Sequence, residues 1–190
     1  GGQLFAEQGR IELGSVNSGL VGLSASATGI VLDYSGLSNF QDIRLDQAAL
    51  IDASEPGGSG IYLTGRQISL TDGSTVLIQN NGITPVGEIT VNATESLEIL
   101  DTTPTGSIRS SLSSETTSSG VGGNIQVSTQ RLTLQGGGQI LSRGFGSGDS
   151  GNVDVNVSER IDVLGSSLLN PTFFSSIFVL TSGGASGQAG

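Results

Sequence analysis

GGNIQVSTQRLTLQGGGQI, residues 122–140, places apolar side chains two positions apart in two pairs, Ile125 with Val127 and Leu132 with Leu134. Shifted back by 64 residues, it overlies GSGIYLTGRQISLTDGSTV without a gap, and GNVDVNVSERIDVL overlies GEITVNATESLEIL in the same way. The first apolar positions of the four units follow one another at steps of 28, 36 and 28 residues: Ile61, Ile89, Ile125 and Val153. A period of this size predicts an array of stacked repeats.

The spacing within each pair indicates β-strands, because side chains at positions i and i+2 point to the same side of a strand. Turn-forming glycine, asparagine, serine and aspartate lie between the pairs. Two all-β architectures are then open, a sandwich of antiparallel hairpins and a coil of parallel strands. The recurrence favours the coil, because equivalent residues of parallel strands lie above one another about 4.8 Å apart and each column keeps one residue type.

Each unit offers three short strands, for example residues 61–63, 68–70 and 76–78. We therefore predict an all-β fold, a three-sided, right-handed parallel β-helix of about six to seven turns and roughly 30 Å length. Residues 1–190 are expected to form a single segment of this β-helix and to be an internal piece of a longer chain. Two segments that lengthen their units are expected to protrude as loops, residues 102–120 and 166–184.

The beginning of the chain follows the repeat less regularly. DIRLDQAALIDAS aligns with QISLTDGSTVLIQ, which places three pairs in shared columns: Ile43 with Ile68, Leu45 with Leu70, and Ile51 with Val76. GRIEL at Gly9 and GIVL at Gly29 have the alternation of a strand, but their spacing to the next pair is irregular.

The composition excludes several classes of function. The chain has no histidine or cysteine, which excludes ordinary zinc, haem and thiolate sites, a cysteine nucleophile and a Ser-His-Asp triad. Seven scattered arginines against 17 acidic residues give a net charge of −10 and no basic stripe, so we expect no nucleic-acid partner. No stretch approaches the roughly 20 apolar residues of a membrane span, and no signal segment begins the chain.

The repeat units resemble those of a known family. GGNIQVSTQRLTLQGGGQILSRGFGSGDSGNVDVNV, with GRIELGSV, NFQDIRLDQAALIDAS and GGSGIYLTGRQISLTDGS, is similar to bacterial filamentous-haemagglutinin-like exoproteins of two-partner secretion. The resemblance implies a right-handed parallel β-helix, export by a partner transporter of the outer membrane, and a rod that displays adhesive regions. The family's secretion domain carries NPNL and NPNGI motifs, from which NNGITP at residues 80–85 differs. The chain therefore looks like a rod downstream of that domain, and no functional residue is carried over.

Candidate chemistry in the sequence is sparse. GFGSGDSGNVD at residues 144–154 is similar to the repeats that bind calcium in β-rolls, but a single imperfect copy favours a solvated turn. A polysaccharide lyase or glycoside hydrolase on a β-helix needs several acids and an arginine on one face, whereas the acids here are dispersed. We expect no catalytic residue, no cofactor and no metal site. Phe173, Phe174 and Phe178 form an apolar feature that either contacts a partner or, the interpretation we favour, folds back over the rod.

These observations lead to two hypotheses about function. The first is a non-enzymatic rod segment of a secreted or cell-surface adhesin, from a bacterium with an outer membrane, with an unknown protein or glycan ligand. The alternative is a polysaccharide lyase or glycoside hydrolase on the same scaffold, since a fold alone does not decide function. Open ends of such a stack expose strand edges, which predicts end-to-end stacking or contact with neighbouring segments.

Overall fold

The computed structural model describes residues 1–26, 29–54, 57–58, 60–182 and 184–190. Within these ranges the chain forms β-strands and no helix. The strands are β1 (Gln3–Phe5), β2 (Arg10–Gly14), β3 (Gly22–Ser26), β4 (Gly29–Asp33), β5 (Ile43–Leu45), β6 (Leu50–Asp52), β7 (Gly60–Leu70), β8 (Thr75–Asn80), β9 (Glu88–Leu100), β10 (Ser111–Thr116), β11 (Ile125–Gln135), β12 (Gln139–Gly144), β13 (Val153–Leu164) and β14 (Ser176–Thr181).

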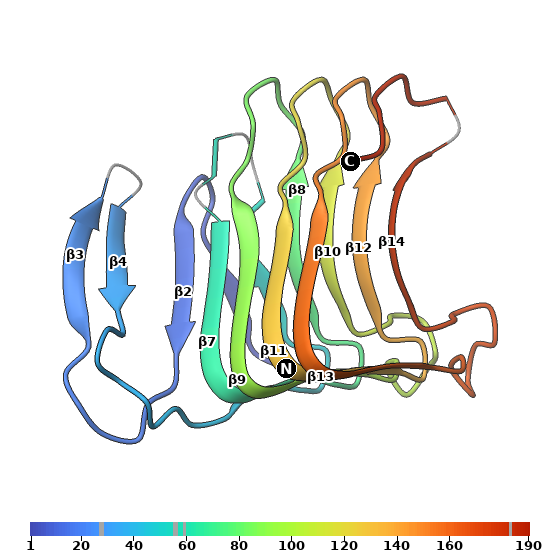
Figure 1. The fold of residues 1–190 in the computed structure, drawn as a ribbon. Helices are drawn as coiled ribbons and strands as arrows, with labels where there is room; N and C mark the ends of the chain where they lie inside the picture. The colour runs from blue at the N-terminus through green and yellow to red at the C-terminus, as the bar shows by residue number, and fades with distance from the viewer. Residues whose placement is uncertain (27–28, 55–56, 59, 183) are drawn as a thin grey trace.

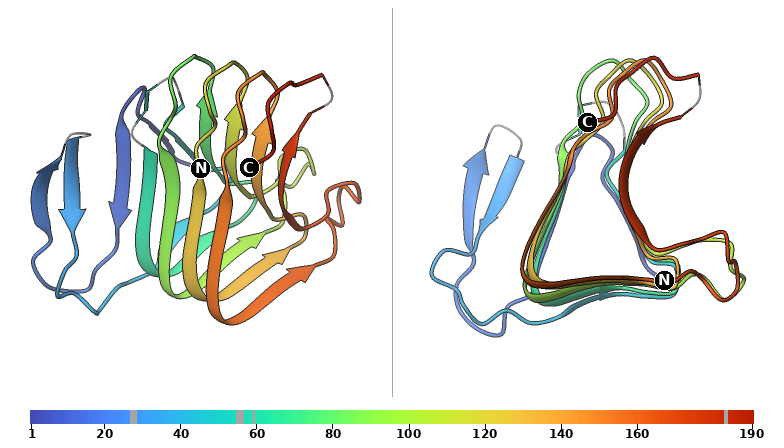
Figure 2. Two further views of the ribbon diagram at one scale, coloured as in Figure 1. Left: turned by 45° about the horizontal axis from the view of Figure 1, so that its top comes forward. Right: turned by 45° about the vertical axis from the view of Figure 1, so that its right-hand side comes forward.

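Twelve of these strands form two parallel sheets, which we call together the stack. Sheet A has the order β1-β6-β8-β10-β12-β14, and sheet B has the order β13-β11-β9-β7-β2 with β5 also beside β7. From β7 to β14 the chain alternates between the sheets, so neighbours within a sheet are separated by one strand of the other (Figure 1). Seen end-on, successive units superpose on a three-sided outline (Figure 2). This arrangement is compatible with a β-solenoid.

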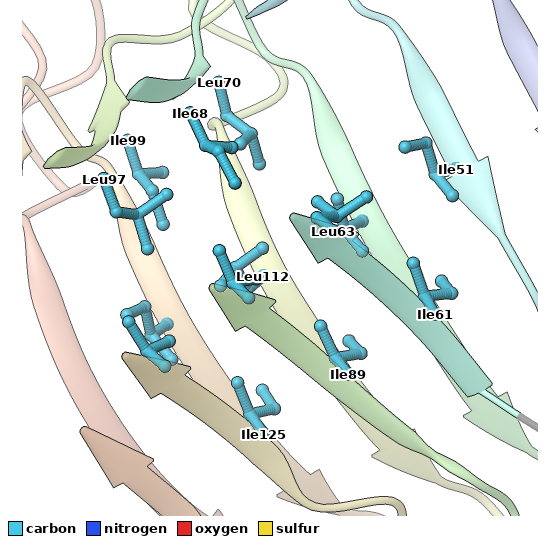
Figure 3. Close-up of a cluster of buried hydrophobic side chains, with 14 of the residues drawn as sticks. Ile51, Ile61, Leu63, Ile68, Leu70, Ile89, Leu97, Ile99, Leu112 and Ile125 are labelled. Carbon is cyan, nitrogen blue, oxygen red and sulfur yellow. The ribbon is translucent and has the colours of Figure 1, made fainter. Parts of the chain in front are cut away.

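The columns expected from the repeat are confirmed by the pairing register. Ile61 pairs with Ile89, Ile89 with Ile125, and Ile125 with Val153. The second column is equally regular: Ile68, Leu97, Leu132 and Ile161. All of these side chains except those of the last strand, β13, are fully buried, and Figure 3 shows the aliphatic groups of neighbouring strands lying beside one another. The three pairs predicted from residues 43–51 are also confirmed.

Each long strand of sheet B bends between its two apolar pairs. The register shifts between Gly65 and Gln67 where β7 meets β9, and between Thr129 and Arg131 where β11 meets β13. An extra residue of this kind is a β-bulge, which turns a strand while its pairing continues on both sides. The bend divides sheet B into two sides of the outline, and sheet A supplies the third.

A tight turn connects sheet B to sheet A. Asp72 and Gly73 both have positive φ angles, 55° and 79°, and the Ser74 amide donates to the Thr71 carbonyl oxygen at 3.1 Å. These are the features of a type I′ turn, which glycine and aspartate tolerate best. The equivalent turn between β11 and β12 contains Gly136, which has a φ angle of 63°.

The boundaries expected for the two protruding segments are too wide. Residues Ser111–Thr116, inside the first segment, form β10 and pair with β8 and β12. Leu112 drives this pairing, because it is fully buried in register with Val76 and Ile140. Residues Ser176–Thr181, inside the second segment, form β14 and pair with β12. Gly183 lies outside the described residues.

The early GIVL motif does not join the stack. It belongs to β4, which pairs antiparallel with β3 in a separate two-stranded sheet. The hairpin is seen beside β2 in Figure 1, and its Leu23 and Ile30 are 71% and 64% exposed. The residues that follow pack locally, with the Tyr34 and Phe40 rings edge to face at 5.9 Å between centroids.

The two tyrosines allow a test of this packing by pH titration. Burial, with help from the carboxylates of Glu12 and Glu88, raises the pKa of Tyr34 and Tyr62 above the ordinary value of 10.0. The folded state thus holds both protons more tightly than the unfolded state. The resulting stability is fully present below pH 10.0 and is lost as the pH rises towards the folded pKa values.

We expect the tyrosinate absorbance of the folded chain to rise at a higher pH than that of the chain in urea. The absorbance change can be assigned to these residues because the chain has two tyrosines and no tryptophan. Coincident titration curves in the two states would contradict burial of the phenol groups.

Candidate functional site

Two loops meet at one corner of the stack. They are residues 102–109, between β9 and β10, and residues 165–175, between β13 and β14, and we call them the corner loops. Both project from the same corner in the end-on view of Figure 2. The hydroxyl groups of Thr102 and Ser167 lie 3.2 Å apart in a buried contact, and the Asn170 side-chain amide donates to the Gly106 carbonyl oxygen at 3.3 Å.

The corner loops can touch because the unit that lies between them in the stack has only a short turn at this corner, residues 136–138 between β11 and β12. That turn contains Gly137, whose amide donates to the Ser175 hydroxyl at 3.1 Å. A Cβ on Gly137 would lie 3.0 Å from the Phe173 carbonyl oxygen, so the second loop passes directly over this glycine. The sequence predicted that the first loop protrudes, and the structure shows in addition that it contacts the second loop.

The three phenylalanines of interest occupy different environments. Phe173 is half-buried, and the Arg109 guanidinium carbon lies 4.1 Å from the centre of its ring. Phe174 is 58% exposed. Phe178 belongs to β14 and pairs in register with Leu141 on the outward side of sheet A. The structure therefore places Phe173 and Phe178 near the same surface and leaves Phe174 open to solvent, and contact with a partner stays a prediction.

The outward surface of sheet A near this corner is unusually well buried. Gln139 and Leu141 of β12 alternate with the inward Ile140, yet they are only 3% and 5% exposed. Ser111 and Ser113, their partners on β10, are 7% and 5% exposed. Alternate residues of a strand point to opposite sides, so these four residues lie on the outer face of sheet A although little of their surface is exposed.

A hollow of about 320 Å³ lies on this outer surface of sheet A. We call it the sheet A hollow. Its lining combines two arginines with hydroxyl, amide and apolar groups: Arg109, Arg143, Ser111, Gln139, Leu141 and Glu115. Arg143 and Glu115 come from paired positions of β12 and β10, and Arg109 comes from the end of the first corner loop.

The two arginines of the hollow differ from most others in the chain. Four arginines form ion pairs with carboxylates: Arg10, Arg66, Arg131 and Arg160. Within the part of the chain that the structure describes, neither Arg109 nor Arg143 forms such a pair, although both are half-buried. Arg44, which also lacks an ion pair there, is exposed to solvent. Water can therefore solvate the charge of Arg44 freely, whereas partial burial limits the water around the charges of Arg109 and Arg143.

The electrostatics of the hollow reflect this lack of compensation. Burial lowers the pKa of Arg109, and the positive charge of Arg143 lowers it further. The Nε atom of Arg143 is buried and has no hydrogen-bond acceptor among the described residues. The nearby Glu115 carboxylate accepts hydrogen bonds from the Gln79 amide at 3.0 Å and the Ser113 hydroxyl at 3.4 Å instead.

Among the described residues, five acidic side chains form ion pairs with arginines: Glu12, Asp42, Glu95, Glu159 and Asp162. Arg66 bridges Asp42 at 2.9 Å and Glu95 at 3.2 Å, and Arg131 pairs with Glu159 at 3.1 Å. In the calcium-like run, the Asp149 carboxylate accepts the Gln188 amide at 2.7 Å. Over the described ranges, no three acidic, histidine or cysteine side chains come together in a way that could hold a metal ion.

Sequence reasoning missed Arg109 and Arg143 as candidate site residues. Arg109 lies in a segment expected to protrude as a loop, and Arg143 follows Ile140 and Leu141 without any motif that would single it out. Their meeting depends on the path of the first corner loop, for which the local sequence carries no periodic signal.

Comparison with protein-family models, with curated proteins and with solved structures finds no match to the chain. Among the residues described, no helix has the length and apolar character needed to span a membrane. A proposal about function therefore depends on the repeat, the geometry of the stack and the sheet A hollow.

Proposed function

We propose that the chain is a non-enzymatic rod segment of a secreted or cell-surface, adhesin-like exoprotein. In this proposal the stack is a three-sided, right-handed parallel β-helix of about six to seven turns. The observation that carries it is the parallel register of equivalent residues through β7, β9, β11 and β13. Such a register lets further units be added without changing the pattern, which is the property that a rod requires.

The surface of the stack supports a role in display. The inward columns of sheet B are aliphatic, whereas outward positions carry polar and charged groups such as Glu98, Gln126 and Asp154. The length of the units varies at the corners, where the corner loops project without interrupting the sheets. In repeat proteins, insertions of this kind often build a binding face.

Export by an outer-membrane partner transporter is proposed from the similarity of the repeat units to two-partner secretion exoproteins. A chain without cysteine is compatible with export, since it has no thiol to oxidise outside the cytosol. Contact with further segments is proposed from the edge strand β13, where Ile161 and Val163 are 50% and 45% exposed.

The location of the chain tests this proposal. We expect antibodies raised against residues 1–190 to label intact cells of the source bacterium or to detect the protein in its culture medium. Deletion of the partner transporter gene should abolish both signals while the protein remains in cell extracts. A cytoplasmic protein is probed in parallel to verify that the cells are intact.

Labelling that requires permeabilised cells in the wild-type strain would contradict the proposal. The same conclusion would follow if deletion of the transporter left the surface signal unchanged, because the rod would then reach the surface by another route.

A further inference from the structure

The sheet A hollow contains two guanidinium groups whose described neighbours include aromatic rings but no ion-pair partner: Arg109 lies 4.1 Å from the centre of the Phe173 ring, and Arg143 lies 5.2 Å from the centre of the Phe145 ring. Arg109 and Arg143 are half-buried, close enough for one charge to lower the pKa of the other, and without an ion pair among the described residues. Partial removal of water makes an unpaired charge costly, and a second charge of the same sign adds to that cost. An anion bound between the two guanidinium groups would relieve both effects.

The charges of the lining indicate the valence of that anion. Arg109 and Arg143 contribute two positive charges and Glu115 one negative charge, which leaves a net charge of +1 in the hollow. A group with one negative charge balances this lining, whereas a phosphate dianion leaves an excess of negative charge beside Glu115. A carboxylate also matches the planar guanidinium donors in shape and can accept two parallel hydrogen bonds.

The other residues of the lining indicate the kind of molecule to which the anionic group belongs. The Arg143 Nε has a buried, unused N–H donor. Thr75 and Ser111 contribute hydroxyl groups to the lining of the hollow, and the side chain of Leu141 contributes apolar surface. Convergent polar groups beside apolar surface are typical of a small-molecule site. A sugar ring offers both kinds of surface, with hydroxyl groups around its edge and C–H groups on its faces.

We propose that the sheet A hollow binds a sugar that carries one carboxylate, as in the uronic acid units of acidic polysaccharides. The carboxylate lies between Arg109 and Arg143, and the sugar hydroxyls meet the hydroxyl and amide groups of the lining. This inference rests on the proposed function and deepens it, because it names the class of ligand that the displayed rod recognises. The hollow admits few units, and the net charge of −10 opposes a polyanion lying along the whole stack.

Calorimetric titration of the 190-residue chain with trigalacturonate tests the proposal, with neutral galactotriose as the matched sugar without carboxylates. At about 0.01 M ionic strength, where screening is weak, we expect the chain to bind trigalacturonate and to ignore galactotriose. Arg109→Gln and Arg143→Gln should each weaken binding at least about tenfold, since a charged hydrogen-bonded contact is lost. Glu115→Gln should strengthen binding, because it removes the negative charge of the lining.

Arg44→Gln is the matched control, because it removes the same charge from the chain at an exposed position outside the hollow. It should leave the dissociation constant within about twofold of that of the wild type, as expected for a distant, screened charge. If a variant in the hollow fails to fold, the side-chain N–H resonance of Arg143 in the wild-type chain provides a second measurement. That resonance should shift when trigalacturonate is added.

Several results would overturn the inference. These are no binding of trigalacturonate, equal binding by the Arg143→Gln and Arg44→Gln variants, or an unmoved Arg143 resonance. Preference for a sulfated trisaccharide would overturn the assignment of a carboxylate, and equal binding of an aspartate tripeptide would overturn the assignment of a sugar. A chain that labels intact cells but binds none of these probes would overturn this inference alone. A chain that binds trigalacturonate but stays inside the cell would overturn the proposed function alone.

Discussion

Replacing Leu97 by alanine is expected to lower the free energy of unfolding by about 2–5 kcal/mol, the range for removing a large aliphatic side chain from a packed interior. Leu97 is fully buried and lies in register between Ile68 and Leu132. The neighbouring side chains belong to sheets held on both sides, so they cannot close the space that the shorter side chain leaves. The cost should therefore fall in the upper half of that range.

Urea-induced unfolding followed by circular dichroism measures this effect. Glu98→Ala is the matched control, because Glu98 follows Leu97 in β9 and is exposed on the opposite side of the strand. We expect it to change the free energy of unfolding by no more than about 0.5 kcal/mol, as is usual for surface positions. Similar effects of the two substitutions would contradict the placement of Leu97 on the inward side of β9 and of Glu98 on the outward side.

Replacing Gly123 by alanine is expected to destabilise the chain by about 3 kcal/mol, the upper part of the usual range for overpacking. Gly123 lies between Gly87 of the preceding unit and Gly151 of the following unit. A Cβ on Gly123 would collide with the Gly87 carbonyl oxygen, and a Cβ on Gly151 would collide with the Gly123 carbonyl oxygen. The colliding atoms belong to the backbone, so relief requires neighbouring units to move apart.

Gly2→Ala is the control for the glycine substitution, because a Cβ at Gly2 meets no atom within 4 Å. Thermal unfolding of the two variants gives the comparison. An unchanged melting temperature for Gly123→Ala would show that the units do not approach as closely at this corner as the structure indicates.

The sequence was sufficient to predict the columns, because parallel stacking repeats one residue type at one place. Ile61, Ile89 and Ile125 are separated by different numbers of residues, yet each begins an alternating segment that could be recognised alone. Strand β10 was missed for the opposite reason. It contributes Leu112 to the interior, but its next inward position is Ser114, so it lacks the apolar pair that Val76 and Ile78 form in β8.

The position of the β3–β4 hairpin and the composition of the sheet A hollow could not be predicted in this way. GIVL has the alternation of a stacked strand, and only the partner with which it pairs shows that it lies outside the stack. Arg109 and Arg143 are separated by 34 positions of chain and meet because the first corner loop turns back at Gly106. Local periodicity carries no information about such contacts between units.

The parallel pairing of the stack also determines how it would respond to force. From β7 to β13, the backbone pairing joins each unit to the unit before and the unit after, which are 28 or 36 residues away in the chain. Tension applied between the two ends would therefore peel away the terminal unit first and leave the rest intact. Each such step releases about 100 Å of extended chain. A rod built in this way would therefore lengthen in stages under load and would not fail in one step.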